Sequence, residues 1–167
     1  FSHVLGYIGF VSKADLESDK NFFINDKIGK TGLEAYYDGA LRGEHGITVK
    51  LRNVKGEVFD EKTMSLPKSG ERLITNIDAE LQKKFYNALS DGLKRVASKA
   101  GAGLAINPQN GEVLALISLP SFNGGIFGRD IIATEKILKD KNQPLFNRIV
   151  SGVYAPGSTI KPLVAAA

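Results

Sequence analysis

Short patterns of apolar residues fill the first part of the chain. An apolar run over residues 4–11, punctuated by glycine, predicts a strand, and residues 13–18 predict a short helix. Alternating apolar positions over residues 46–66 predict a β-hairpin that turns at residues 55–56. After a break that contains proline and glycine, residues 72–77 are expected to form a further strand.

A helix is also predicted in this first part. Thr31 and Glu34 have the spacing of a capping box, so we expect a helix from there to about Arg42. The Gly-Lys-Thr triplet that begins at Gly29 suggests a phosphate-binding loop, but that motif needs a glycine five positions earlier, where Ile24 stands. The spacing therefore excludes a nucleotide-binding loop.

Longer patterns follow in the second part. Asp78 is a suitable N-cap for an amphipathic helix over residues 79–100. Five apolar residues recur at helical spacing within it: Leu81, Phe85, Leu89, Leu93 and Val96. Two nearly all-apolar runs, 103–106 and 113–117, flank a turn and predict central strands covered on both faces. A last helical segment is expected near residues 131–138.

The change from short strands and turns to a long helix indicates a domain boundary near Ile77. We therefore expect two partial units, residues 1–77 and residues 78–167. The mixture of helices and antiparallel strands predicts the α+β fold class. The sequence contains no internal repeat and no low-complexity tract.

Composition narrows the classes of function. With 43% hydrophobic and 24% charged residues, the chain is typical of a folded globular protein. Its net charge of +4 comes from basic residues interleaved with acids, so nucleic acid is not an expected partner. Cysteine is absent, and His3 and His45 stand without other ligands at metal-binding spacing. We therefore expect neither a metal nor a cofactor.

The two ends of the sequence bear on its setting. No apolar run is long enough to span a bilayer, and Phe1 stands where a methionine or a charged signal-peptide head would begin a complete protein. At the other end, the apolar helical pattern of residues 163–167 stops without a glycine or a basic last turn. We therefore expect this chain to be an internal piece of a longer protein.

The candidate chemistry lies in residues 154–162, where Ser158 and Lys161 stand three positions apart at the expected start of a helix. On a helix this spacing places both side chains on one face, with Cβ atoms roughly 5–6 Å apart. A neutral lysine amine can then take the hydroxyl proton while the serine attacks a carbonyl carbon. For this to occur at neutral pH, burial or a nearby cation must lower the pKa of the lysine.

Neighbouring residues support this placement. Pro162 is tolerated only near the first turn of a helix, so the helix is expected to begin near Ser158. The helix N-terminus and the Ser158 N–H would then face a developing oxyanion. Pro156 and Gly157 favour a sharp turn that exposes the serine.

Spacing alone does not decide between two interpretations of this pair. Ser65 and Lys68 have the same interval across a loop proline, where it arises by chance. For an isolated pair, the alternative is a serine that caps a helix and a surface lysine one turn further on. The surrounding sequence favours the catalytic interpretation.

That surrounding sequence resembles the class B penicillin-binding proteins. Residues 154–162, preceded by Asn147-Arg148, are similar to the first catalytic motif of that family. Further stretches match in family order. Residues 3–9 and 29–43 are similar to the pedestal of the penicillin-binding protein 2 (elongation) type. Residues 73–81 resemble the segment before the first helix of the transpeptidase domain, and residues 103–123 resemble that domain's first hairpin. The resemblance therefore covers nearly the whole chain.

The resemblance implies a pedestal (dimerisation-type) domain joined to the start of a transpeptidase domain of the serine β-lactamase-like fold. It implies a peptidoglycan D,D-transpeptidase in which Ser158 is the nucleophile and Lys161 the general base. Its substrate would be the D-Ala-D-Ala end of a stem peptide, and β-lactam antibiotics would trap the serine. It also implies a single-pass anchor in the bacterial cell membrane, with this region on the extracytoplasmic (periplasmic) side. Its expected partners are a SEDS-family glycan polymerase and other proteins of the elongation complex.

The family's later serine-x-asparagine and lysine-threonine-glycine motifs are absent from residues 1–167. We therefore expect this piece alone not to form crosslinks. Two alternatives stay open. A serine β-lactamase or carboxypeptidase shares the serine-lysine pair, but it would not be expected to carry the pedestal-like first part. A non-catalytic structural and docking module is the other alternative.

Overall fold

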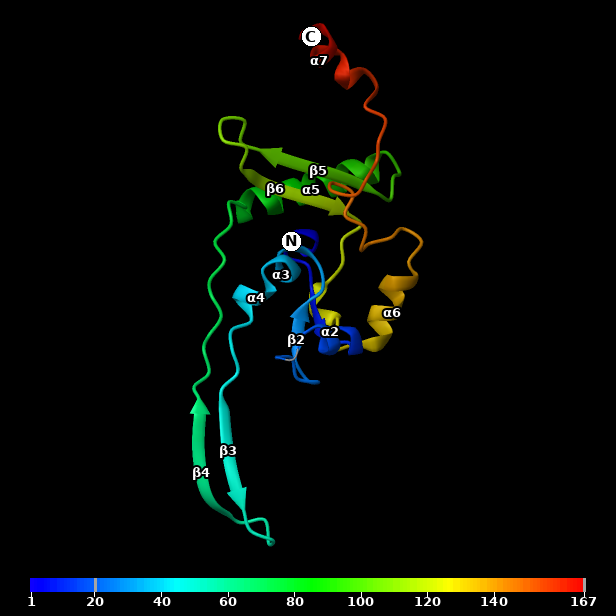
Figure 1. Cartoon of the computed structure of the whole chain (residues 1–167). Helices are drawn as coiled ribbons and strands as arrows, with labels where there is room; N and C mark the ends of the chain where they lie inside the picture. Colours follow the sequence, from blue (N-terminus) through cyan, green and yellow to red (C-terminus); the bar gives the residue numbers. More distant parts are fainter. Residues whose placement is uncertain (20, 167) are drawn as a thin grey trace.

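The computed structural model describes residues 1–19 and 21–166. The strands in this part of the chain form antiparallel pairs: β1 (Ile8–Phe10) with β2 (Lys27–Gly29), β3 (Ile47–Arg52) with β4 (Val58–Ser65), and β5 (Gly101–Ile106) with β6 (Val113–Leu119). Helices lie between and beside these pairs (Figure 1). The α+β fold class is therefore confirmed. No helix of the described region has both the length and the apolar character that a membrane span requires.

The chain begins with a helix where the sequence predicts a strand. α1 (Ser2–Leu5) is followed by Gly6 at φ 86°, so the strand expected over residues 4–11 is reduced to β1. A positive φ is accessible to glycine without strain, and here it reverses the chain between helix and strand. α2 (Lys13–Ser18) has the predicted bounds and begins with a capping box formed by Ser12 and Asp15.

The helix expected from Thr31 to about Arg42 is two short helices, α3 (Gly32–Tyr36) and α4 (Asp38–Leu41). They meet at Tyr37, whose φ of −105° and ψ of 17° interrupt the helix. Thr31 is the N-cap, but its side chain accepts no capping hydrogen bond, so the predicted capping box is wrong. The interruption lets the Asp38 carboxylate accept a hydrogen bond from the Gly29 N–H at 2.8 Å, which ties α4 to β2.

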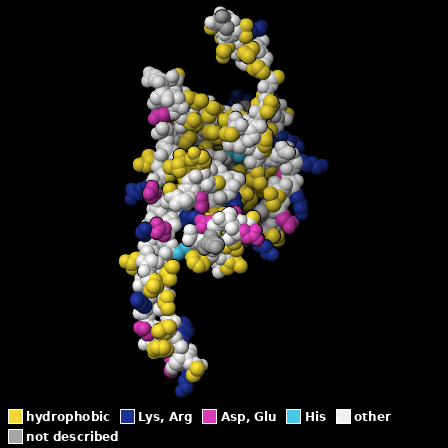
Figure 2. Space-filling model, viewed as in Figure 1, with side chains coloured by type: hydrophobic (Ala, Val, Ile, Leu, Met, Phe, Trp, Pro, Cys, Tyr) yellow, Lys and Arg dark blue, Asp and Glu magenta, His cyan; other side chains and the backbone are white. Residues whose placement is uncertain are grey.

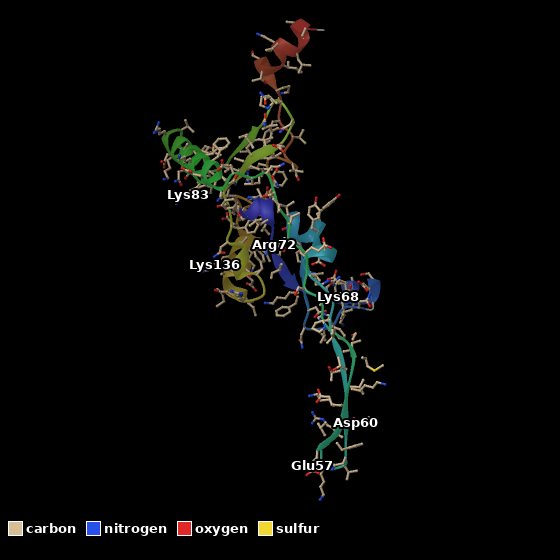
Figure 3. All side chains as sticks on the ribbon, turned by 90° about the vertical axis from the view of Figure 1, so that its left-hand side faces the viewer. Glu57, Asp60, Lys68, Arg72, Lys83 and Lys136 are labelled. Carbon is tan, nitrogen blue, oxygen red and sulfur yellow. The ribbon has the colours of Figure 1, made fainter. Side chains whose placement is uncertain are left out.

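The predicted hairpin over residues 46–66 is confirmed as β3 and β4, and it projects away from the other elements (Figure 1). Figure 3 places Glu57 and Asp60 towards its far end, with side chains extending from both faces. Every residue of both strands is exposed. The following residues 72–77 do not form the expected strand, because no neighbouring strand in the described chain receives their backbone hydrogen bonds.

α5 (Ala79–Arg95) covers the β5–β6 pair and is positioned by two polar residues. The Asp78 carboxylate caps it by accepting hydrogen bonds from the N–H groups of Glu80 and Leu81, as predicted. Gln82, only 3% exposed, donates from Nε2 to the Leu116 carbonyl at 2.7 Å and accepts from the Leu116 N–H at 2.8 Å. The helix ends before the predicted residue 100, because the chain turns at residue 97, where φ is +52°.

The small core lies between α5 and β6. Ala115, Ile117 and Leu119 of β6 are buried, and the Phe85 ring lies so close to Gly103 that a Cβ there would stand 2.5 Å from it. Coverage of both faces, as predicted for the two central strands, is wrong for β5. Its Leu104 and Ile106 are exposed, because no element of the described chain packs on that face.

Candidate active site

Ser158 and Lys161 lie in the last described segment of the chain. Ser158 belongs to the 3₁₀ turn η2 (Gly157–Ile160), and Lys161 is the first residue of α7 (Lys161–Ala166). This segment lies apart from the β5–β6 pair and α5 (Figure 1). Both side chains are exposed. The segment therefore owes its local conformation to its own residues.

The local backbone brings the serine and the lysine to the same side of the turn. Gly157 has φ 56°, a left-handed conformation that favours glycine, and it starts the turn directly after Pro156. The Lys161 N–H then donates to the Ser158 carbonyl, closing an i to i+3 bond. Side chains three positions apart eclipse each other in a 3₁₀ helix. The expected start of the helix near Ser158 is confirmed, although its first turn is 3₁₀ rather than α.

Activation of the lysine would need more than this turn supplies. Within the described residues, no hydrogen bond joins the Ser158 hydroxyl to the Lys161 amine, and neither group is buried. The desolvation that favours a neutral amine is therefore not provided by residues 1–19 and 21–166. Pro162 lies at the second position of α7, within the first turn, where proline is tolerated in an α-helix.

The segment before the turn is held by several hydrogen bonds, and we call residues 142–152 the anchor loop. Arg148 is 9% exposed, and its guanidinium donates to the carbonyls of Asn142 at 2.6 Å and of Gln143 and Phe146 at 3.2 Å. Ser118 of β6 accepts from the Arg148 N–H and donates to the Phe146 carbonyl, each at 3.1 Å. Sequence reasoning missed these roles, although the resemblance had singled out Asn147-Arg148.

The N-terminal helix reaches the same loop. His3 Nε2 lies 2.7 Å from the Pro144 carbonyl, so this nitrogen carries the proton and donates. The His3 ring also meets Phe122 edge-on. Burial lowers the pKa of His3 below 6.5, and the nearby charge of Arg148 lowers it further, against the opposing effect of the Pro144 hydrogen bond. The lowered pKa favours the neutral imidazole, so an uncharged ring makes this contact between the two parts of the chain.

A cavity of about 680 Å³ opens beside this contact. Residues from both parts line it, among them Val4, Leu33, Ile77, Leu116 and Val150. Most of these side chains are apolar, and they come from α1, α3 and the anchor loop among other segments.

Comparison with known families gives two matches along the chain. Residues 1–75 match the model described as "Penicillin-binding Protein dimerisation domain", and residues 101–167 match the "Penicillin binding protein transpeptidase domain". The chain therefore belongs to the penicillin-binding proteins. The resemblance found in the sequence is confirmed, including its similarity to the penicillin-binding protein 2 type.

Individual relatives support the same family. The chain is 40% identical over 169 residues to "Penicillin-binding protein 3" of Bacillus subtilis, and 37% identical over 169 residues to "Peptidoglycan D,D-transpeptidase MrdA" of Acinetobacter baumannii. Each alignment covers 99% of this chain and 24% of the relative. The chain thus spans about a quarter of the length of these relatives.

Solved structures share the fold as well. The penicillin-binding protein 2 of Helicobacter pylori, in complex with MreC, matches with a TM-score of 0.79 and 31% identity, over 98% of this chain and 30% of that one. A structure described as "Structural coordination of polymerization and crosslinking by a peptidoglycan synthase complex" matches with a TM-score of 0.77 and 33% identity, over 96% and 30%.

Proposed function

We propose that the full-length protein is a peptidoglycan D,D-transpeptidase of cell-wall synthesis, with Ser158 as nucleophile and Lys161 as general base. The observation that carries this proposal is the 3₁₀ turn, because it aligns a serine and a lysine three positions apart on one side of the chain. The family match over residues 101–167 and the D,D-transpeptidase name of a relative with 37% identity support it.

The proposed reaction has two steps. The Ser158 hydroxyl attacks the carbonyl carbon of the penultimate D-alanine of a stem peptide, Lys161 takes the hydroxyl proton, and the terminal D-alanine leaves with a proton on its amine. The amine of a neighbouring stem peptide then attacks the resulting ester, forms the new peptide bond and frees the serine. A β-lactam would acylate the same oxygen and remain attached. Later motifs complete this site in the family, so residues 1–167 alone are expected to be inactive.

The proposed organisation places a pedestal in residues 1–77 and the start of the transpeptidase domain in residues 78–167. A single-pass anchor in the bacterial cell membrane would hold both on the extracytoplasmic side. The proposed partners are a SEDS-family glycan polymerase and other elongation-complex proteins. Two similar solved structures support this, since one is a complex with MreC and the other a peptidoglycan synthase complex.

A docking module is the second candidate function, and one observation favours it. The β3–β4 hairpin projects from the other elements and buries none of its residues, which is unusual for a two-stranded ribbon because such ribbons are marginal alone. A hairpin of this kind gains stability when a partner covers it. This role is compatible with a transpeptidase and would be the only role if Ser158 does not react.

Intact mass spectrometry of the full-length protein after incubation with a β-lactam tests the proposal. We expect one adduct that is absent from Ser158→Ala and still present in Ser65→Ala, which removes the serine of the chance pair with Lys68. The chain of residues 1–167 is expected to stay unlabelled. Absence of an adduct on the full-length protein would contradict the transpeptidase function and favour the docking module.

A further inference from the structure

The anchor loop is the last segment before the candidate nucleophile that is bonded to other elements of the chain. Beyond Gly152 the chain leaves the surface, and Val153 is 97% exposed. Gly152 itself is tightly enclosed, since a Cβ there would stand 2.4 Å from both the Arg148 carbonyl oxygen and the Tyr154 ring. Ser158 lies six positions after Gly152, so the two residues can be at most about 20 Å apart. The point and direction of exit from the loop therefore limit where the serine can lie.

Arg148 fixes the first half of the loop in an unusual way. It is buried, and within the described residues no carboxylate forms an ion pair with it; three main-chain carbonyls accept its hydrogen bonds instead. Burying a cation among neutral acceptors is costly, and an apolar side chain would fill the same space at lower cost. The forked guanidinium does what an apolar group cannot, because it holds several carbonyls in one fixed arrangement.

Asn147 fixes the second half. Its Oδ1 accepts hydrogen bonds from the Ile149 N–H at 3.1 Å and from the Val150 N–H at 3.4 Å, while its carbonyl accepts from the Ser151 N–H at 2.9 Å. These bonds form the turn that leads directly to Gly152. Two adjacent residues thus act in opposite directions along the chain, with Arg148 holding the residues before it and Asn147 the residues after it.

We propose that Asn147 and Arg148 are positioning residues that set the exit of the anchor loop and thereby hold Ser158 in its reactive place. This inference rests on the proposed transpeptidase function. Ser118 is part of the same device, because its hydroxyl fastens both Arg148 and the Phe146 carbonyl to β6. Neither residue touches the substrate in this account, so their effect falls on the rate of acylation and not on initial binding.

The test compares variants of the full-length protein in stopped-flow acylation by a fluorescent penicillin, with melting temperatures measured in parallel. Asn147→Ala removes the acceptor of the turn, whereas Asn147→Asp keeps a side-chain oxygen in place. Arg148→Lys keeps the charge but loses the fork. Asn107→Ala is the matched control, because Asn107 Oδ1 accepts the Gln109 N–H at 3.0 Å in the β5–β6 turn, away from the anchor loop.

We expect Asn147→Ala and Arg148→Lys to lower the limiting acylation rate constant about 10- to 100-fold, with the dissociation constant of the noncovalent complex changed less than about twofold. Asn147→Asp should recover most of the rate, and Asn107→Ala should match the wild type. Melting temperatures close to wild type would separate positioning from a loss of fold.

Three results would overturn the proposal. These are acylation rates close to wild type in Asn147→Ala and Arg148→Lys, an equal loss in Asn107→Ala, or a loss fully explained by the unfolded fraction of each variant. Failure of the wild type itself to acylate would instead remove the proposed function on which the inference stands. A wild type that acylates, with Asn147→Asp as slow as Asn147→Ala, would retain the function and reject the positioning role of Asn147.

Discussion

The two long hairpins of the described chain have very different surroundings. In β5–β6, α5 covers one face, and Ala115, Ile117 and Leu119 are buried. In β3–β4, apolar side chains such as Ile47 and Val49 remain exposed, and Figure 2 shows apolar, basic and acidic groups intermingled along the projecting hairpin. Both hairpins form by local strand pairing, but the burial of their side chains depends on which other elements pack against them.

The difference arises because α5 packs against β5 and β6, whereas it does not cover the β3–β4 pair that precedes it in the chain. Gln82 and Phe85 extend from α5 onto β6 and β5, so that one hairpin becomes half of a two-layer unit. The other hairpin is held at its base by main-chain bonds between Glu44 and Lys68, and by their side-chain ion pair at 2.9 Å. Substitutions in the two hairpins should accordingly have effects of different size.

The largest effect is expected at Gln82. Gln82→Ala leaves the N–H and the carbonyl of Leu116 without partners, so the free energy of unfolding should fall by about 2–4 kcal/mol. Urea denaturation measures this change. Lys83→Ala on the same helix is the control, because Lys83 is exposed and its loss should matter little. A loss below about 1 kcal/mol for Gln82→Ala would show that these two bonds do not hold the helix.

A smaller effect than that of Gln82→Ala is expected at Asp78. Asp78→Ala removes the acceptor of two N–H groups at the start of α5, so the free energy of unfolding should fall by about 1 kcal/mol. Asparagine is an equally good N-cap, and Asp78→Asn should therefore stay close to wild type in the same urea measurement. Equal losses in both variants would point to the charge of Asp78, and not to capping, as the source of stability.

A matched pair of threonine substitutions compares the hairpins directly. Leu51 of β3 is 47% exposed, and Leu51→Thr should change the free energy of unfolding by no more than about 0.5 kcal/mol. Ile117 of β6 is 2% exposed, and Ile117→Thr should cost several times more because it buries a hydroxyl. Thermal melting of the two variants side by side checks this. A large loss for Leu51→Thr would mean that the β3–β4 hairpin is covered in solution.

The smallest change is expected in the first part of the chain at acid pH. The Lys30 ammonium, with hydrogen bonds from Ser12, lowers the pKa of the Asp15 carboxyl from 3.8 to about 2. Since the folded-state pKa is lowered, this contribution to stability is complete above pH 3.8 and is lost as the pH falls through about 2. Carboxyl titration by NMR should find the Asp15 pKa raised in Lys30→Met and unchanged in Lys27→Met. An unchanged value in Lys30→Met would leave the Ser12 hydrogen bonds as the cause.

Local patterns in the sequence predicted the elements whose determinants are local. The bounds of α2, the β3–β4 hairpin and the cap at Asp78 follow from residues within a few positions of each other. Predictions failed where distant partners decide the outcome. Residues 72–77 have a strand pattern but no neighbouring strand, and β5 has the apolar pattern of a covered strand but exposes Leu104 on its outer face.

The candidate site likewise has some features that depend on nearby residues and others that depend on distant ones. The alignment of Ser158 and Lys161 depends on four consecutive residues, so spacing and Pro162 were enough to predict a turn there. The bonds that hold the chain leading to it join Ser118 to Arg148 and His3 to Pro144, residues 30 and 141 positions apart. No periodicity or local motif carries such pairings, and only the folded chain reveals them.

The contact between Gln82 and Leu116 also determines which edge of the β5–β6 sheet can pair with a further strand. Gln82 occupies the outward backbone groups of Leu116, and the Asp78 N–H occupies the Leu114 carbonyl, so this side of β6 is sealed against another strand. Leu104 lies opposite Leu116 in the register, and its own backbone groups face outward on the other side, where no bond within the described residues reaches them. Any strand that enlarges this sheet must therefore join at β5, and the sheet can be extended in one direction only.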